Sequence, residues 1–260
     1  MGGMTAVMKR ELQSYFYSPV AYAVMVMFLI IAGYFFYTGM VYYGVASFEI
    51  SRMAQFGGGM EQELNVEEYI LRPLFGNMSV VLLMMAPLFT MRLFSEEKKG
   101  GSIELLFTWP IKDLALVMGK YLAALAMVSI MVAPTFIYIG LLAYHSGFSW
   151  GCVVTGYLGL ILLGGAFISL GIFISTLTEN QIISAAITFG ALLLFWIISW
   201  AAGSDTGTIA EILKGFSILE RVDNFAKGVL DTRDIVYYAT FNFFFLFLTI
   251  RSLESKNWRG

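Results

Sequence analysis

Long apolar runs without a single Asp, Glu, Lys or Arg constrain this chain more than any other feature. The bounds of these runs are 20–48, 73–91, 121–178, 180–204 and 235–250. A helix of about 20 apolar residues is long enough to cross the hydrocarbon core of a bilayer. The chain is 58% hydrophobic and 13% charged, whereas soluble domains have about 45–50% and about 25%. The runs therefore predict an all-α integral membrane protein.

The run 121–178 is too long for one crossing, and His145, Ser146 and Gly147 interrupt it with polar residues and a glycine. We therefore expect a single transmembrane domain, residues 1–260, with six spans. Their predicted bounds are about 20–42, 73–93, 119–144, 152–177, 181–202 and 235–252. Ten Lys and Arg residues fall on the side of the N-terminus and six on the other. By the positive-inside rule, both termini are expected in the cytoplasm.

A short segment before the first span, residues 4–17, has apolar and polar residues on opposite faces of a helix. This pattern predicts an amphipathic helix that lies on the cytoplasmic membrane surface. Ser18-Pro19 is expected to end it, because proline disfavours a helical residue before it. The alternative is that it extends the first span. The two basic and two apolar residues that characterise it are Lys9, Arg10, Leu12 and Phe16.

The connection 92–120 between the second and third spans carries charges, a glycine corner and a short apolar stretch. Arg92 to Lys99 is charged, and Gly100-Gly101 follows. Ser102 is an N-cap residue type, and Trp109-Pro110 ends the stretch that follows it. A short helix with apolar residues on the aqueous side needs a partner surface; the alternative is that it packs back on the bilayer.

The connection 204–234 on the outer side contains two amphipathic patterns. One is expected from Thr208 to Lys214, and the other from Ser217 to Lys227-Gly228. Glycine after the last helical residue is a common helix end. We expect two short helices at the outer leaflet, or dipping into it.

The chemistry that the chain lacks narrows its function. Carriers and pumps that use ion gradients need ionisable groups inside the membrane, and the apolar runs have none. Backbone carbonyls at broken helices still leave ion binding open. One His and one Cys are too few for a usual zinc site, and Gly119-Lys120 lacks the rest of a nucleotide-binding loop. We expect no catalytic residue, no metal site and no nucleic-acid partner.

Spans four and five carry small residues, and in span four these recur at intervals of four, a spacing that lets helices approach closely. They are Gly165, Ser169, Gly171 and Ser175. Packing within this chain is one interpretation. A surface for a second copy or for a substrate path is the other.

Three stretches are similar to a known family. The segment from Arg92 to Leu106, which ends at Pro110, resembles the cytoplasmic loop of ABC-2 type transporter permeases. The stretches 174–181 and 223–237 resemble the junction of spans four and five and the approach to the last span in that family. The resemblance covers the chain, and it is closest to the gliding-motility-associated and multicopper-maturation branch.

The resemblance implies an ABC-2, or type V exporter-like, fold with an elbow helix at 4–17, a coupling helix in 92–120 and an outer re-entrant segment at 204–234. It implies a bacterial cytoplasmic (inner) membrane protein that pairs with a second copy of itself. Two copies of a separate ATPase would bind ATP and Mg. The residues implied at the ATPase contact are Glu96, Glu97, Ile103, Glu104, Leu105, Leu106, Phe107 and Glu179.

The expected function is a permease subunit that couples ATP hydrolysis on that ATPase to substrate export or to transmembrane force. An outer auxiliary protein could dock on the acidic connection 49–72 and the outer helices. Uncharged spans in contact with membrane lipid suit a lipid, a hydrophobic molecule or a mechanical role. The alternatives are a stand-alone channel or carrier, and a membrane scaffold that transports nothing.

Overall fold

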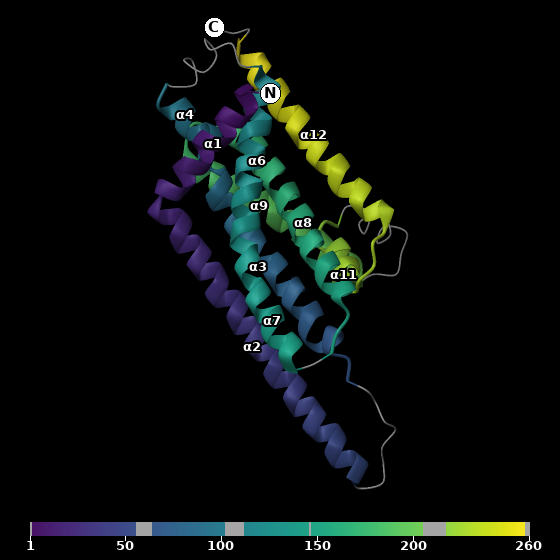
Figure 1. The fold of residues 1–260 in the computed structure, drawn as a ribbon. Helices are drawn as coiled ribbons and strands as arrows, with labels where there is room; N and C mark the ends of the chain where they lie inside the picture. Colours follow the sequence, from purple (N-terminus) through teal and green to yellow (C-terminus); the bar gives the residue numbers. More distant parts are fainter. Residues whose placement is uncertain (1, 56–63, 102–111, 146, 205–216, 258–260) are drawn as a thin grey trace.

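The computed structural model describes residues 2–55, 64–101, 112–145, 147–204 and 217–257. These residues form helices and short connections, and no strand occurs among them. Figure 1 shows an elongated bundle in which α1 begins and α12 ends at the same end of the molecule. We call this end the α1 end, and we call the opposite end, where α2 and α7 terminate, the far end.

The chain is almost entirely helical. The α-helices are α1 (Gly2–Tyr17), α2 (Pro19–Gln55), α3 (Arg72–Thr90), α4 (Arg92–Lys99), α6 (Asp113–Val132), α7 (Phe136–His145), α8 (Trp150–Leu177), α9 (Gln181–Ser204), α11 (Glu220–Ala226) and α12 (Thr232–Asn257). A π-helical turn precedes α3 at Glu67–Leu71, and a 3-10 turn joins α6 to α7 at Ala133–Thr135.

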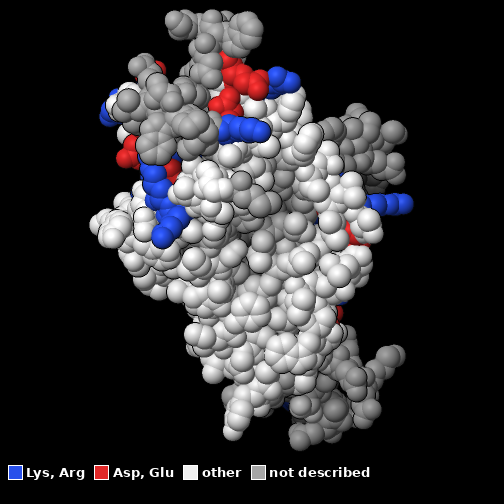
Figure 2. Space-filling view, turned by 45° about the horizontal axis from the view of Figure 1, so that its top comes forward, with Lys and Arg blue, Asp and Glu red and all other residues white. Residues whose placement is uncertain are grey.

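Six helical stretches are long and apolar enough to cross a membrane, which confirms the predicted fold class. They are Pro19–Met53, Glu67–Lys99, Asp113–Tyr144, Trp150–Leu177, Gln181–Ile198 and Thr232–Ser255. Each overlaps one predicted span. In the face shown in Figure 2, acidic and basic side chains gather at the α1 end, above a broad uncharged surface. This distribution is the one that a lipid environment requires.

The central helix of the bundle is α8, which contacts α3, α6, α9, α11 and α12. Most of its span is buried, whereas only a minority of the residues in the spans of α2, α9 and α12 are buried. Figure 1 shows α2 and α12 along opposite edges. In a membrane, the exposed apolar side chains of these outer helices lie against lipid.

The first span continues well past its predicted end near residue 42, since α2 runs for 37 residues to Gln55. At 1.5 Å per residue its length is about 55 Å, against about 30 Å for the hydrocarbon core. The last turns of α2 project beyond the rest of the bundle at the far end (Figure 1). The apolar run stops at Phe48, so periodicity alone could not place the end of a helix that continues in water.

In the third span the α-helix is broken at Pro134. Proline has no N–H to donate to the preceding turn, and a 3-10 turn replaces the α-helix there. The Thr135 hydroxyl donates to the carbonyl of Val132 at 2.6 Å. A hydroxyl side chain next to the proline therefore supplies a hydrogen bond to a backbone carbonyl at the break.

The outer connection before α12 is described from Ser217 onward. The second predicted helix is present as α11, but it begins at Glu220 rather than at Ser217. Gly228 follows it with a φ of +83°, the left-handed conformation that favours glycine. The first predicted helix, 208–214, lies outside the described residues. Re-entrance of this segment into the membrane stays a prediction.

Candidate functional site

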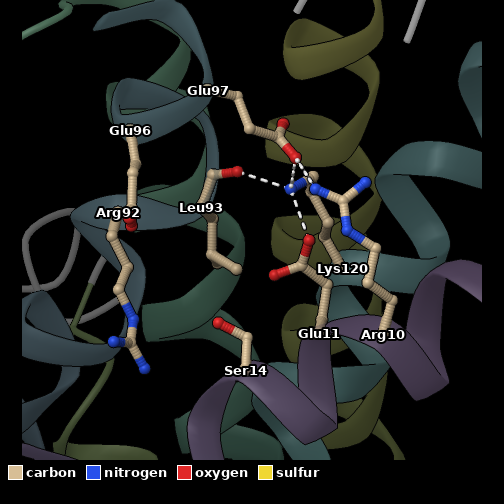
Figure 3. Close-up of a pocket in the computed structure, with 8 residues that line it drawn as sticks. All are labelled: Arg10, Glu11, Ser14, Arg92, Leu93, Glu96, Glu97 and Lys120. Atoms are coloured by element: carbon tan, nitrogen blue, oxygen red, sulfur yellow. Dashed lines mark hydrogen bonds and ion pairs between the residues drawn. The ribbon is translucent and has the colours of Figure 1, made fainter. Parts of the chain in front are cut away.

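A buried lysine joins three helices at the α1 end. Lys120, in the second turn of α6, is 1% exposed. Its Nζ lies 2.8 Å from Glu11 Oε1 on α1 and 2.9 Å from Glu97 Oε1 on α4. It also donates to the carbonyl of Leu93 at 2.6 Å. Figure 3 shows these three contacts converging on one ammonium group, so each of its three N–H donors has an acceptor. We call Glu11, Glu97 and Lys120 the lysine cluster.

The cluster is a case of buried charges that depend on one another. An ion removed from water costs several kcal/mol unless a partner of opposite sign compensates it. Glu97 is 7% exposed, and Arg10 adds an ion pair to the same Oε1 at 3.4 Å. Arg10 is exposed, so its contribution is screened by water. The ion pair of Lys120 with Glu97 and its hydrogen bond to the Leu93 carbonyl therefore fix α4 to α6.

Hydroxyl groups attach α4 to the end of α8. The Ser175 hydroxyl accepts hydrogen bonds from the N–H groups of Phe94 at 2.9 Å and Ser95 at 3.1 Å. The Ser95 hydroxyl donates to the Ser175 carbonyl at 3.1 Å. Lys98 Nζ donates to the carbonyl of Thr176. All of α4 is thereby held against the α1 end of α8.

The N-terminal helix packs against α6 because Gly119 allows the approach. A Cβ at Gly119 would lie 2.9 Å from the carbonyl oxygen of Met4 and 2.9 Å from the Cβ of Val7. Tyr15, 1% exposed, donates to the carbonyl of Phe89 at 2.8 Å. Burial raises the pKa of Tyr15, so its hydroxyl stays a donor at neutral pH. The apolar face expected to rest on lipid is thus partly covered by protein.

The comparison with protein families decides what kind of protein contains this arrangement. The model described as "ABC-2 family transporter protein" matches residues 5–250. The chain belongs to the ABC-2 transporter family. No curated protein matches it, and the family match names no narrower branch such as the gliding-motility-associated one.

An ABC-2 permease works with an ABC ATPase partner and is the membrane component rather than the ATPase. The described residues contain no group of His, Cys, Asp and Glu that could hold a metal ion. The ion pairs and hydrogen bonds at the α1 end fix helices relative to one another.

The residues expected at an ATPase contact divide into three groups. Ile103, Glu104, Leu105, Leu106 and Phe107 lie outside the described residues. Glu96 on α4 and Glu179 between α8 and α9 are exposed at the α1 end. Glu97 instead points inward to Lys120, where it can position the neighbouring segment but cannot present its carboxylate to another protein.

The residues that characterise the N-terminal helix lie on two sides of it. Lys9 and Arg10 are exposed, and Leu12 packs partly against the core. Phe16 is 42% exposed. The last turn of the helix therefore buries Tyr15 against protein and keeps Phe16 outside.

The four small residues of the fourth span all lie inside the chain. A Cβ at Gly165 would lie 2.7 Å from the Tyr121 hydroxyl of α6, and one at Gly171 would clash with Thr90 of α3. Ser169 and Ser175 are both 0% exposed. In this arrangement they serve packing within one chain, and they present no surface to a second copy.

Sequence reasoning missed the lysine cluster, because it counted Lys120 only as a cytoplasmic charge. A usable signal was present in the N-terminal helix. Val7, Glu11 and Tyr15 are four residues apart, which places the carboxylate on the face that is buried. A carboxylate on a buried face requires a cation close to it. Lys120 supplies this cation from α6, the helix against which α1 packs.

A second group of charges holds α11 to the bundle. Asp223 of α11 pairs with Arg72, whose second guanidinium nitrogen lies 2.7 Å from Oδ2, and with Lys227 at 2.7 Å. Burial acts to raise the pKa of Asp223, but the hydrogen bonds from Arg72 and Lys227 outweigh it, so the pKa lies below its ordinary value. Arg221 of α11 lies 2.6 Å from Asp234 at the start of α12.

Proposed function

We propose that this chain is the permease subunit of an ATP-driven transporter and that the segment 100–112 receives movement from a separate ATPase. The observation that supports the proposal is the position of the lysine cluster. Glu97 lies three residues before this segment, and Lys120 lies eight residues after it. Their ion pair of 2.9 Å joins the two helices that the segment connects.

The coupling then follows from rigidity. A displacement of the segment 100–112 has to move α4 and the start of α6 together, because the cluster fixes them to each other. Glu11 extends the same unit to α1, and Ser175 extends it to α8. Movement at the surface would therefore reach the central helix of the bundle through the contacts of Lys120 and Ser175.

In this proposal the α1 end faces the cytoplasm of a bacterial cell, with both termini inside, in the cytoplasmic membrane. Two copies of the chain pair with two ATPase subunits, which bind ATP and Mg. Ile103, Glu104, Leu105, Leu106 and Phe107 provide the docking helix, and Glu96 and Glu179 flank it. The branch of the family and an outer auxiliary protein at 49–72 stay predictions.

The first test is assembly. The chain is expressed together with a candidate ABC ATPase from the same genome and purified through a tag on the chain, and the intact mass of the complex is measured by native mass spectrometry. We expect a complex with two copies of each. The variant Leu105→Glu with Leu106→Glu should lose the ATPase and keep the pairing of the chain with itself. If this variant retains the ATPase in full amount, the segment 100–112 is not the docking site.

A further inference from the structure

A groove beside the lysine cluster has the lining expected of a phospholipid site. It lies between α2, α3, α4 and the start of α9, and its volume is about 190 Å³. Val20, Val24 and Leu88 form its apolar walls. A cavity of about 150 Å³ accommodates benzene, so this groove has room for several methylene groups of an acyl chain.

The groove has a polar end at the level where the apolar helices begin. Arg92, Glu96 and Gln181 line this end. Gln181 is the first residue of α9, and Arg92 donates to the hydroxyl of Ser18, the residue between α1 and α2. If the apolar helices cross the membrane, these positions lie near the interface between lipid and water, where a headgroup lies above its acyl chains.

Arg92 has no anionic partner among the residues described. Its guanidinium lies 4.7 Å from the centre of the Tyr15 ring and donates to Ser18 Oγ at 3.1 Å. Figure 3 shows it directed away from Lys120 and the carboxylates bound there. A guanidinium has five N–H donors in a planar fork that suits a phosphate. The half-buried cation therefore leaves donors for an anionic group at the mouth of the groove.

Glu96 places a negative charge one helical turn from Arg92. Its side chain is exposed, and within the described parts of the chain it forms no ion pair. A lipid with only an anionic headgroup would bring its charge close to this carboxylate. A headgroup with a phosphate and an ammonium group matches both residues at once.

We propose that the groove binds a zwitterionic phospholipid with a primary amine, of the phosphatidylethanolamine class. Its phosphate accepts from Arg92, its ammonium donates to Glu96, and one acyl chain lies along Val20, Val24 and Leu88. The lipid thereby fastens α4 to α2 and α9 on the side away from Lys120. The site depends on the membrane location of the chain and shares Glu96 with the proposed ATPase contact, but lipid binding is measured on the chain alone, without an ATPase.

The test uses the full chain, stripped of lipid in detergent and titrated with single phospholipids while bound lipid is counted by native mass spectrometry. Dioleoyl phosphatidylethanolamine should bind about tenfold more tightly than dioleoyl phosphatidylglycerol, since a charged hydrogen bond contributes about that much. Dioleoyl phosphatidylcholine, whose quaternary ammonium has no N–H, should also bind more weakly.

Two variants separate the polar contacts. Arg92→Gln should lose about tenfold in affinity for phosphatidylethanolamine. Glu96→Gln should bring the affinities for phosphatidylethanolamine and phosphatidylglycerol close to each other. The matched control is Arg10→Gln, which changes an arginine beside the lysine cluster but outside the groove, and should bind as the wild type does.

The wild-type comparison decides the question even if Arg92→Gln fails to fold. Equal affinity for the three lipids, or tighter binding of phosphatidylglycerol, would overturn the proposal. A further variant, Leu88→Trp, fills the apolar wall at a position that is 39% exposed. This variant should bind all three lipids more weakly and to the same extent. Unchanged affinity of this variant would show that the acyl chain lies elsewhere.

Discussion

Replacing Lys120 by methionine removes the cation from the lysine cluster while keeping a long apolar side chain. The side chains of Glu11 and Glu97 are 13% and 9% exposed. They would be left close together, and Arg10 is the remaining cation that the structure places within ion-pair distance, at 3.4 Å from Glu97. Removing one partner of a buried ion pair typically costs about 3–5 kcal/mol. We expect Lys120→Met to be destabilised by that amount.

The assay is thermal unfolding of the purified chain in detergent, followed by the loss of monodisperse protein on heating. Arg10→Gln is the matched control, because Arg10 pairs with the same Glu97 oxygen from the exposed side. An exposed pair is worth about 0–1 kcal/mol, so this variant should unfold near the wild type. The triple variant Lys120→Met, Glu11→Gln, Glu97→Gln should recover most of the loss, since no unpaired charge is left.

The four proteins should differ in a fixed order of stability. Wild type and Arg10→Gln should be the most stable, the triple variant intermediate, and Lys120→Met the least stable. If Lys120→Met unfolds at the same temperature as Arg10→Gln, the buried ion pairs do not hold α1, α4 and α6 together. The proposed route of coupling would then lose its structural basis.

Three further predictions concern other contacts. Gly171→Ala should lower the free energy of unfolding by about 1–3 kcal/mol, because the new Cβ overlaps Thr90. Gly190→Ala, with open space around it, should raise that free energy by about 0.5–1 kcal/mol. Equal melting temperatures of the two variants would contradict the close packing of α8. Ser175→Ala should lower the free energy of unfolding by about 1–3 kcal/mol, since two buried N–H groups of α4 lose their acceptor. Amide hydrogen exchange should become faster in α4 alone. Unchanged exchange in α4 would contradict this role of Ser175. Asp223→Asn should be less stable by roughly 0.5–1 kcal/mol at pH 7. Because the folded pKa of this carboxyl is lowered, the difference should stay constant above about pH 4 and shrink as the pH falls further; a difference that grows on acidification would contradict the ion pairs.

Local signals were enough to predict the parts of the fold that depend on neighbouring residues. The break at Ser18-Pro19 and the end of α11 shortly before Gly228 are both confirmed, because a proline and a left-handed glycine determine the backbone where they stand. The six apolar stretches are confirmed because their length is set by the membrane itself. The projection of α2 was missed, since a helix in water needs no apolar run.

The candidate site depends on contacts between residues distant in the chain, and single residues gave little sign of it. Glu97 was expected at the surface with Glu96, yet adjacent residues on a helix point about 100° apart. One of them is exposed and the other meets Lys120. Ser175 was recognised as a small packing residue, but its role as the acceptor for α4 appears only once α8 and α4 lie together.

The central claim is that ATP hydrolysis on a separate subunit reaches the membrane through the segment 100–112 and the lysine cluster. Its most direct test is the rate of ATP hydrolysis by the partner ATPase in vesicles, with and without this chain. We predict that the rate changes when the wild-type chain is present. Lys120→Met should lose this effect while the ATPase stays bound, and Arg10→Gln should keep it. An ATP hydrolysis rate that is the same with the chain, without it and with Lys120→Met would contradict the account.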